Sequence, residues 1–387
     1  MTDEGIYERR EQTQVKHLIL RQYLERFTHI VGSRWDSITY VDGFAGPWNA
    51  KSPDLKDSSF SIALEELRKA RASHAQRGRN VHLRCFFLEQ SREAYVQLKQ
   101  FADRVSDAEV AVRNCRFEDA TDDICKFVQK GEGTFPFIFI DPTGWTGFAL
   151  KTIAPLLRLN PGEVLINFMT GHIRRFLREE HSEQSFVELF GSADFKMRTA
   201  GRSGVDLEDS AIAEYMNRIK EAGEFRYVLP AIVLHPEIDR THFHLIYATR
   251  HPKGVEVFKG AEKRAMEEME RLRAGAQRRR REERTLQGEF LFQTETAPQS
   301  RYYQDLRERY LGGAQQELQR LLAARRRVPY DVAWEIALKS PLVWESDLKS
   351  WIQDWQEQRA LRIDGLQGRE RVPNRDRSHV LVWVANR

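Results

Sequence analysis

The sequence predicts a doubly wound α/β protein with a mostly parallel seven-stranded sheet, followed by a small C-terminal domain. Apolar runs typical of strands alternate five times with segments of helical periodicity. Such alternation indicates a parallel sheet covered by helices on both faces. Two further apolar runs, 225–236 and 241–252, are separated only by the turn "EIDR". They predict a hairpin, with one antiparallel strand at the edge of the sheet.

The first predicted helix covers 13–31, where apolar residues recur at helical intervals from Val15 to Phe27. The run "TFPFIFIDPTGW", residues 134–145, is almost entirely apolar, which is typical of a central strand in a parallel sheet. Ser91 is expected to cap a later helix. The other alternating elements are predicted as strands over 37–44, 81–89, 110–115 and 163–169, helices over 61–72, 91–102, 119–130 and 152–159, and a helical insertion over 171–195.

The composition changes after Gly260, where a mixed-charge helix contains the run Arg278 to Arg281. A linker follows, and from Arg301 onward short helices precede two strands around a polar loop. This order predicts a winged helix-turn-helix, in which Ser346 caps the recognition helix. The predicted boundaries are 1–270 for the sheet domain, 271–300 for the charged helix and linker, and 301–387 for the winged helix-turn-helix domain.

Composition restricts the class of protein further. The chain has 387 residues and a formal net charge of +4, which weakly favours nucleic acid as a partner. Its three cysteines form no CxxC pair, so neither a disulfide framework nor a zinc knuckle is predicted, and a reducing cytoplasm fits. There is no apolar run of 18 residues and the N-terminus is polar. We therefore expect a soluble cytoplasmic protein that does not enter a membrane.

The stretch "YVDGFAGPW" ends the first predicted strand at the edge of the sheet where ligands bind in such folds. Gly43 and Gly46 allow the backbone to approach a ligand closely, because a glycine has no Cβ. The Asp42 carboxylate favours a ligand with an ammonium group. Glu89, at the end of the second strand, can accept two hydrogen bonds from a ribose diol. A nucleoside that carries an amino acid meets both conditions, and S-adenosylmethionine (SAM) is such a molecule.

Other nucleotide ligands fit this loop less well. A dinucleotide site requires GxGxxG at a helix N-terminus, whereas this loop has two glycines separated by two residues with an acid in front. A carboxylate beside a pyrophosphate would be repulsive, and no GxxxxGK[ST] motif occurs. The alternative without a ligand is that Gly43 and Gly46 only form a tight turn.

Asp141 and Pro142 follow the apolar central strand and should lie at the mouth of the same pocket. A carboxylate and a carbonyl in this position can hold an exocyclic amine and orient its lone pair. Trp145 could stack on a base that has been flipped out of a helix. The alternative is that Asp141 caps the following helix and Trp145 belongs to the core.

Histidines and arginines elsewhere carry less information. His235, His242, His244 and His251 surround the predicted hairpin, but no acid or cysteine completes a ligand set, and we expect the hairpin to lie far from the cofactor loop. No metal site is predicted. The arginine runs 278–281 and 325–327 are candidates for phosphate contacts.

The motifs "YVDGFAGPW", "FFLEQ", "FIFIDPTGW", "EVLINFMTGHIRRF" and "HFHLIYATRHPKGVEVF" together resemble the three-Cys-motif partner (TcmP) family. The resemblance covers about residues 10 to 265. It implies a bacterial protein with a class I methyltransferase fold of the Rossmann-like kind, encoded beside a radical-SAM-like protein with a three-cysteine motif. The chain is also similar to bacterial ribosomal RNA adenine-N6 methyltransferases, which have a Val-Leu-Lys-His element at the position of Val15, Lys16 and His17.

The resemblance implies roles for individual residues. Asp42, Gly43, Phe44 and Gly46 match the cofactor loop, Glu89 matches the acid that holds the ribose, and Phe117 lies where a side chain flanks the adenine. Asp141 and Pro142 match the catalytic Asp-Pro. Lys16 is a candidate for contact with substrate or cofactor. The implied cofactor is SAM.

The sequence departs from the family pattern at Trp48, at Ser58-Ser59-Phe60, and at Thr143 and Gly144, where adenine methyltransferases have Pro and Tyr. Two functions therefore stay open. The first is SAM-dependent methylation of an exocyclic amine of a DNA or RNA base, with adenine N6 favoured. The second is a non-catalytic SAM-binding or scaffold partner of the radical-SAM-like three-Cys-motif protein.

Overall fold

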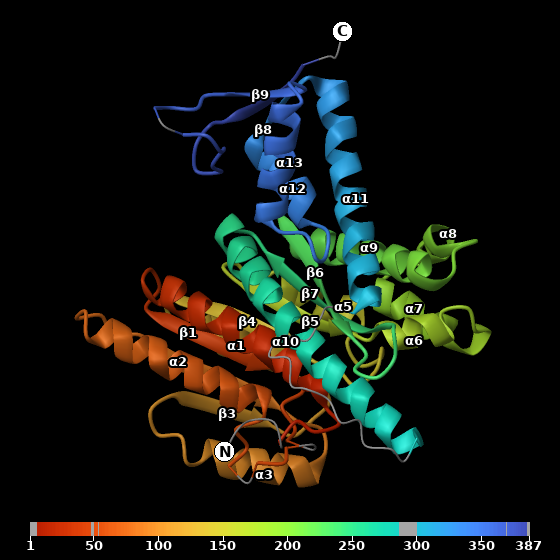
Figure 1. Ribbon diagram of the computed structural model, residues 1–387. Helices are drawn as coiled ribbons and strands as arrows, with labels where there is room; N and C mark the ends of the chain where they lie inside the picture. Colours follow the sequence, from red (N-terminus) through yellow and green to blue (C-terminus); the bar gives the residue numbers. More distant parts are fainter. Residues whose placement is uncertain (1–5, 48–49, 53, 286–299, 369, 385–387) are drawn as a thin grey trace. The chain divides into compact units, whose positions relative to one another are not determined.

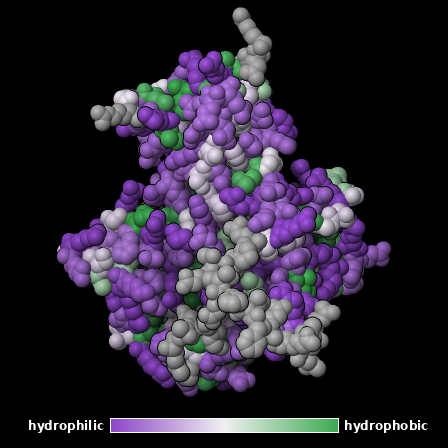
Figure 2. All heavy atoms as spheres, viewed as in Figure 1, coloured by the Kyte–Doolittle hydropathy of each residue, from purple (hydrophilic) through white to green (hydrophobic). Residues whose placement is uncertain are grey.

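The computed structural model describes residues 6–47, 50–52, 54–285, 300–368 and 370–384. The chain forms two compact units, Met1–Gln293 and Thr294–Arg387. Trp48, one of the departures from the family pattern, lies outside the described residues. None of the described helices is long and apolar enough to cross a membrane. The face of the molecule in Figure 2 is mainly hydrophilic, with scattered hydrophobic residues.

The first unit is built on a seven-stranded sheet in the order β3-β2-β1-β4-β5-β7-β6 (Figure 1). All neighbours are parallel except β7, which is antiparallel to both β5 and β6. This order and this single reversed strand are those of a class I methyltransferase, so the predicted fold is confirmed. The strands are β1 Ser37–Asp42, β2 His82–Leu88, β3 Glu109–Arg113, β4 Thr134–Ile140, β5 Glu163–Phe168, β6 Tyr227–Leu234 and β7 Thr241–Thr249.

The hairpin of β6 and β7 exists as predicted, but its order in the sheet is different. The reversed strand β7 lies one place inside the edge, between β5 and β6, and the edge strand β6 runs in the same direction as β5. Pairing of β7 with β5 joins Phe168 to His244. The start of β7 therefore meets the carboxyl end of β5.

Helices cover both faces of the sheet (Figure 1). On one face α1 packs between α2 and α10, and Phe137 of β4 stacks on Tyr23 of α1 at 5.3 Å between ring centroids. On the other face Ile138 and Ile140 belong to the core that β4 shares with α4, α5 and α9. The helices are α1 Glu11–Gly32, α2 Ser59–Ala75, α3 Arg92–Ala102, α4 Thr121–Lys130, α5 Leu150–Leu157, α6 Thr170–Phe176, α7 Glu183–Phe190, α8 Phe195–Thr199, α9 Gly204–Gly223 and α10 Pro252–Thr285.

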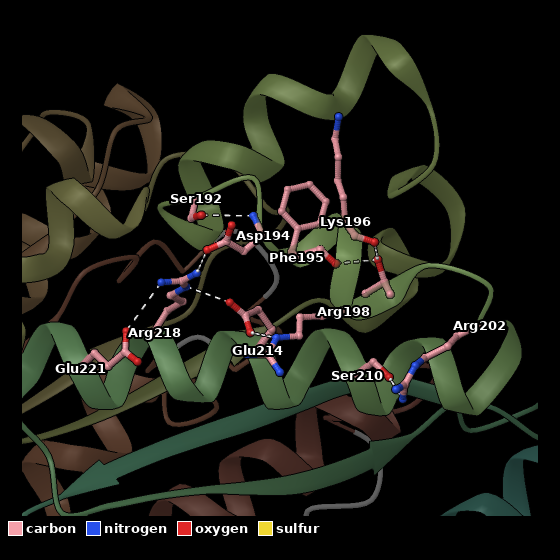
Figure 3. A network of polar contacts seen from close by, with 11 residues as sticks. Ser192, Asp194, Phe195, Lys196, Arg198, Arg202, Ser210, Glu214, Arg218 and Glu221 are labelled. Atoms are coloured by element: carbon pink, nitrogen blue, oxygen red, sulfur yellow. Dashed lines mark hydrogen bonds and ion pairs between the residues drawn. The ribbon is translucent and has the colours of Figure 1, made fainter.

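The predicted helical insertion over 171–195 contains α6 and α7 and ends where α8 begins, and α8 leads into α9. Figure 3 shows how α8 is held against α9. The Arg218 guanidinium of α9 donates to Asp194 at 2.7 Å and to Glu214 at 2.8 Å. Arg202 donates to Ser210 at 2.6 Å across the turn before α9. The bonds from Arg218 to Asp194 and from Arg202 to Ser210 thus tie the segment around α8 to α9.

The second unit has the order α11, β8, α12, α13, β9, β10, with an antiparallel sheet in the order β8-β10-β9. Trp334, Trp344, Trp351 and Trp355 are buried in its core. The elements are α11 Arg301–Arg325, β8 Arg327–Pro329, α12 Tyr330–Leu338, α13 Glu345–Glu357, β9 Leu361–Asp364 and β10 Val380–Trp383.

The prediction that Ser346 caps α13 is wrong. The helix begins at Glu345, and Trp344 occupies the N-cap position, so Ser346 lies within the first turn. The Asp347 carboxylate accepts the N–H of Trp344 at 2.8 Å and performs the capping instead.

Candidate functional site

A cavity of about 280 Å³ lies at the carboxyl edge of the sheet. Its walls come from the ends of β1, β4 and β5, the start of β7, the start of α1 and the segment before α2. The chain crosses over between β1 and β4, where ligands bind in open α/β sheets. Arg10, which precedes α1, donates to Asp57 at 2.7 Å and ties the two outer walls together.

Lys16, Asp141 and Asn167 form the polar centre of this cavity. The Lys16 ammonium donates to one oxygen of the Asp141 carboxylate, and the Asn167 amide donates to the other at 2.7 Å. Three elements contribute one residue each, namely α1, the residue after β4, and β5. The structure thus brings together Lys16 and Asp141, which the sequence placed 125 positions apart.

Pro142, Phe44 and Gly46 also line the cavity. The sequence named these two loop residues as cofactor contacts and Pro142 as the partner of Asp141. All three stand at the end of a strand or in the loop that follows it, because the turn after a parallel strand must leave the sheet at this edge. Five of the residues selected from the sequence therefore share one cavity: Lys16, Phe44, Gly46, Asp141 and Pro142.

Asp42 is completely buried behind the loop. Burial raises the pKa of its carboxyl from 3.8 to about 6, although three hydrogen bonds oppose the rise. The carboxylate accepts from the Ser59 hydroxyl at 2.5 Å, from the Phe44 N–H at 3.1 Å and from the Tyr40 hydroxyl at 3.3 Å. Ser59, a departure from the family pattern, is thus a direct partner of Asp42. A buried carboxylate with no cationic side chain among these partners is suited to a cationic ligand group.

Position 43 must be a glycine because the Phe117 side chain packs against it. A Cβ at this position would lie 2.6 Å from the ring of Phe117. Phe117 is 2% exposed and its ring centroid is 5.2 Å from that of Phe44. The sequence analysis expected a ligand to approach the backbone of Gly43 closely, but in the structure the Phe117 ring does so. Phe117 does not line the cavity.

Glu89 and Trp145 also lie outside the cavity lining. Glu89 is 2% exposed, and its carboxylate accepts the N–H of Ser91 at 2.5 Å. Ser91 caps α3 as predicted, since its hydroxyl accepts the N–H of Ala94. The Trp145 ring stacks on Phe186 with centroids 5.7 Å apart.

The surroundings of Trp145 match the alternative that places it in the core. Its indole N–H donates to the Ser185 hydroxyl at 2.9 Å, and its ring also stacks on Phe176 at 4.9 Å. The indole therefore contacts both α6 and α7 of the insertion.

His242 and Phe243 line the cavity, which corrects the expectation that the hairpin lies far from the cofactor loop. The error came from the sheet order. Because β7 runs antiparallel beside β5, its first residues reach the carboxyl edge. Asn167 was missed for a different reason: it lies inside an apolar strand rather than after it, and its only sequence signal is one amide in "EVLINFM".

Burial lowers the pKa of His242 to about 4, with help from His235 and Arg240, so its imidazole is neutral at physiological pH. Burial likewise lowers the pKa of His244 to about 3. The Nδ1 of His244 is hydrogen-bonded to Thr170 at 2.6 Å. Within the described part of the chain, no three His, Cys, Asp or Glu side chains are placed to hold a metal ion.

No family model and no curated protein matches the sequence. Among solved structures, a DUF519-family protein of Legionella pneumophila matches with a TM-score of 0.36 and 11% identity, over 61% of this chain and 85% of that one. Human methyltransferase-like protein 13 in complex with SAH matches with a TM-score of 0.32 and 13% identity, over 65% of this chain and 91% of that one. A loganic acid methyltransferase with SAH matches with a TM-score of 0.31 and 8% identity, over 72% of this chain and 91% of that one. Because these TM-scores are low, the fold assignment rests on the strand order.

Proposed function

We propose that this protein is a SAM-dependent methyltransferase that acts on an exocyclic amine of a nucleic-acid base, with adenine N6 favoured. One observation carries the proposal. A single cavity joins the loop after β1 to the Asp141-Pro142 pair after β4. A methyl donor held by the loop and an amine held by the pair would face each other across this cavity.

The cofactor half of the proposal rests on Asp42 and the loop that follows it. Asp42 is ionised in the interior only at a cost, because burial raises its pKa to about 6. The ammonium of an amino-acid moiety would offset that cost. Gly46 lines the cavity, whereas the Asp42 carboxylate is buried outside its lining. Bound SAM would supply an electrophilic methyl on a sulfonium.

The acceptor half rests on Asp141 and Pro142. Transfer of a methyl group to an amine requires orientation, since the nitrogen lone pair must point along the sulfur–carbon bond. In such a transfer the nitrogen would form the new N–C bond as the S–C bond pair passes to sulfur, and the nitrogen would then lose one proton to water. Lys16 and Asn167 hold the Asp141 carboxylate from two sides and fix its direction.

Nucleic acid as the partner is supported by the second unit. Its order of helix, strand, two helices and two strands matches the order that defines a winged helix. Arg325, Arg326 and Arg327 follow one another where α11 meets β8. We propose that they, and the run 278–281 in α10, contact phosphates.

The TcmP resemblance supports a second candidate, a non-catalytic partner of a radical-SAM-like three-Cys-motif protein. Each oxygen of Asp141 already has a protein partner, and Thr143 and Gly144 stand where adenine methyltransferases have Pro and Tyr. Under this second candidate function, the protein would bind SAM and an unmodified protein partner but would methylate no nucleic acid.

The first experiment is calorimetric titration of the purified protein with SAH, beside the Glu89→Ala variant. Under the proposal the wild type binds at micromolar concentration and the variant loses binding. Methyl transfer from labelled SAM to DNA and to RNA is then compared in wild type and Asp141→Ala. Loss of transfer with SAH affinity retained supports Asp141 as the residue that holds the amine. Transfer by the variant would refute that role, and SAH binding without any transfer would favour the second candidate.

A further inference from the structure

Two buried amide oxygens point to a preference of the cavity for hydrogen-bond donors. Asn167 Oδ1 and Gln12 Oε1 have no hydrogen-bond partner among the described residues, and both residues line the cavity. Asn167 is 3% exposed. A buried carbonyl oxygen without a partner is destabilising by roughly 1–3 kcal/mol, so such atoms at a cavity indicate a missing donor.

The orientation of the Asn167 amide follows from chemistry. Its neighbour at 2.7 Å is Asp141 Oδ1, and an ionised carboxylate only accepts hydrogen bonds. The NH₂ group must therefore face Asp141. Its nitrogen also lies 3.6 Å from the Met169 sulfur. The amide oxygen is left as the available hydrogen-bonding atom of this side chain.

The position of Asn167 assigns it to the acceptor side of the cavity. From β1 the sheet continues through β4 to β5 and then β7. The cofactor loop follows β1, Asp141 follows β4, and Asn167 lies in β5 next to the start of β7. A group bound at Asn167 therefore lies on the β5 side of Asp141, and the cofactor loop lies on its β1 side.

We propose that Asn167 Oδ1 directly accepts an N–H of the acceptor amine held by the Asp141-Pro142 pair, and that Asp141, by accepting the Asn167 NH₂ group, fixes the orientation of this amide. The inference rests on the proposed function and names the contact that selects its substrate. It requires an acceptor with an unsubstituted or singly substituted amine. The Asp141-Pro142 pair remains the candidate for the second N–H of a primary amine.

The test is binding of two nucleosides in the presence of saturating SAH, measured by titration calorimetry or ligand-observed NMR. Adenosine carries the exocyclic amine and purine riboside lacks it. Wild type should bind adenosine at least about tenfold more tightly, because a site built for an N–H rejects an analogue without one. Asn167→Leu should bring the two affinities to within about twofold of each other.

Met169→Leu is the matched control. It changes the other neighbour of the Asn167 amide nitrogen and also lines the cavity, but it removes no oxygen. It should keep the preference for adenosine. Asn167→Ser, which retains a small acceptor, is the second variant if Asn167→Leu does not fold, and it should retain part of the preference.

The outcomes separate this inference from the proposed function. If Asn167→Leu and Asn167→Ser bind SAH and still prefer adenosine as the wild type does, the inference is wrong and the proposed function stands. If wild type binds SAH but does not distinguish the nucleosides, the proposed substrate is wrong and the inference falls with it. Failure of the wild type to bind SAH overturns the proposed function at the cofactor.

Discussion

Replacing Asp42 with Asn should stabilise the folded protein at neutral pH. Burial raises the pKa of this carboxyl from 3.8 to about 6. Between these values the folded state holds a proton that the unfolded state has lost, so stability falls as the pH rises through this window and the penalty is constant above it. The window spans about two pH units, and each corresponds to roughly 1.4 kcal/mol, so the ionised carboxylate costs about 3 kcal/mol.

Asparagine removes this penalty because it does not ionise, and it can keep the polar contacts of the site. Its amide oxygen can accept the N–H of Phe44, and its NH₂ can donate to the hydroxyls of Ser59 and Tyr40 once these rotate. We therefore expect a gain of about 1–3 kcal/mol above pH 7, which is a rise of roughly 2–4 °C in Tm for each kcal/mol. The gain should disappear near pH 4.

The assay is scanning calorimetry of the full chain and the variant from pH 4 to pH 8, with Asp57→Asn as the matched control. Asp57 is also buried, but it pairs with the Arg10 guanidinium at 2.7 Å, so its neutralisation should destabilise the protein at pH 7. A loss of stability in Asp42→Asn at pH 8, or a difference from wild type that does not change with pH, would refute the reasoning. Under the proposed function the same variant binds SAH at least about tenfold more weakly.

Three further outcomes are expected. Gly43→Ala should lower the free energy of unfolding by about 1–3 kcal/mol, because its Cβ would meet the Phe117 ring at 2.6 Å, and Phe117→Leu should restore part of the loss in denaturant unfolding. Trp145→Phe should cost about 1 kcal/mol through the lost bond to Ser185 while SAH affinity stays within about twofold. Lys16→Met, assayed with labelled SAM, should lower methyl transfer at least about tenfold, since Asp141 loses its ammonium partner; unchanged transfer would contradict that pairing.

The sheet could be predicted because its signals are local. Buried strands are mostly apolar, and β1, β5 and β6 are buried at every residue. A turn after such a strand must emerge at the carboxyl edge, so Asp141 could be assigned to the site from one strand alone. Lys16 was found through its resemblance to a motif, and its helix position next to Asp141 agrees with that choice.

The parts that could not be predicted depend on contacts between distant segments. Nothing in "THFHLIYATRHP" states that the strand inserts beside β5 rather than at the edge, and this insertion brings His242 to the cavity. The packing of Phe117 over Gly43 is likewise a side-chain contact that spacing does not encode. The Asn167 amide oxygen is unpaired because Asp141 binds the NH₂ group of the same amide. This contact joins β5 to the residue after β4 and cannot be seen in the sequence.

The insertion of β7 between β5 and β6 has a consequence for synthesis of the chain. During translation β6 emerges first, yet among the described strands it pairs only with β7. A nascent chain that stops before Thr241 therefore has β5 as an exposed edge strand and β6 without a place in the sheet. When β7 pairs with β5, it covers that edge, brings β6 into the sheet and delivers His242 to the cavity in the same step. The strand that closes this side of the sheet therefore also supplies part of the pocket wall, and it is synthesised after all five parallel strands β1 to β5.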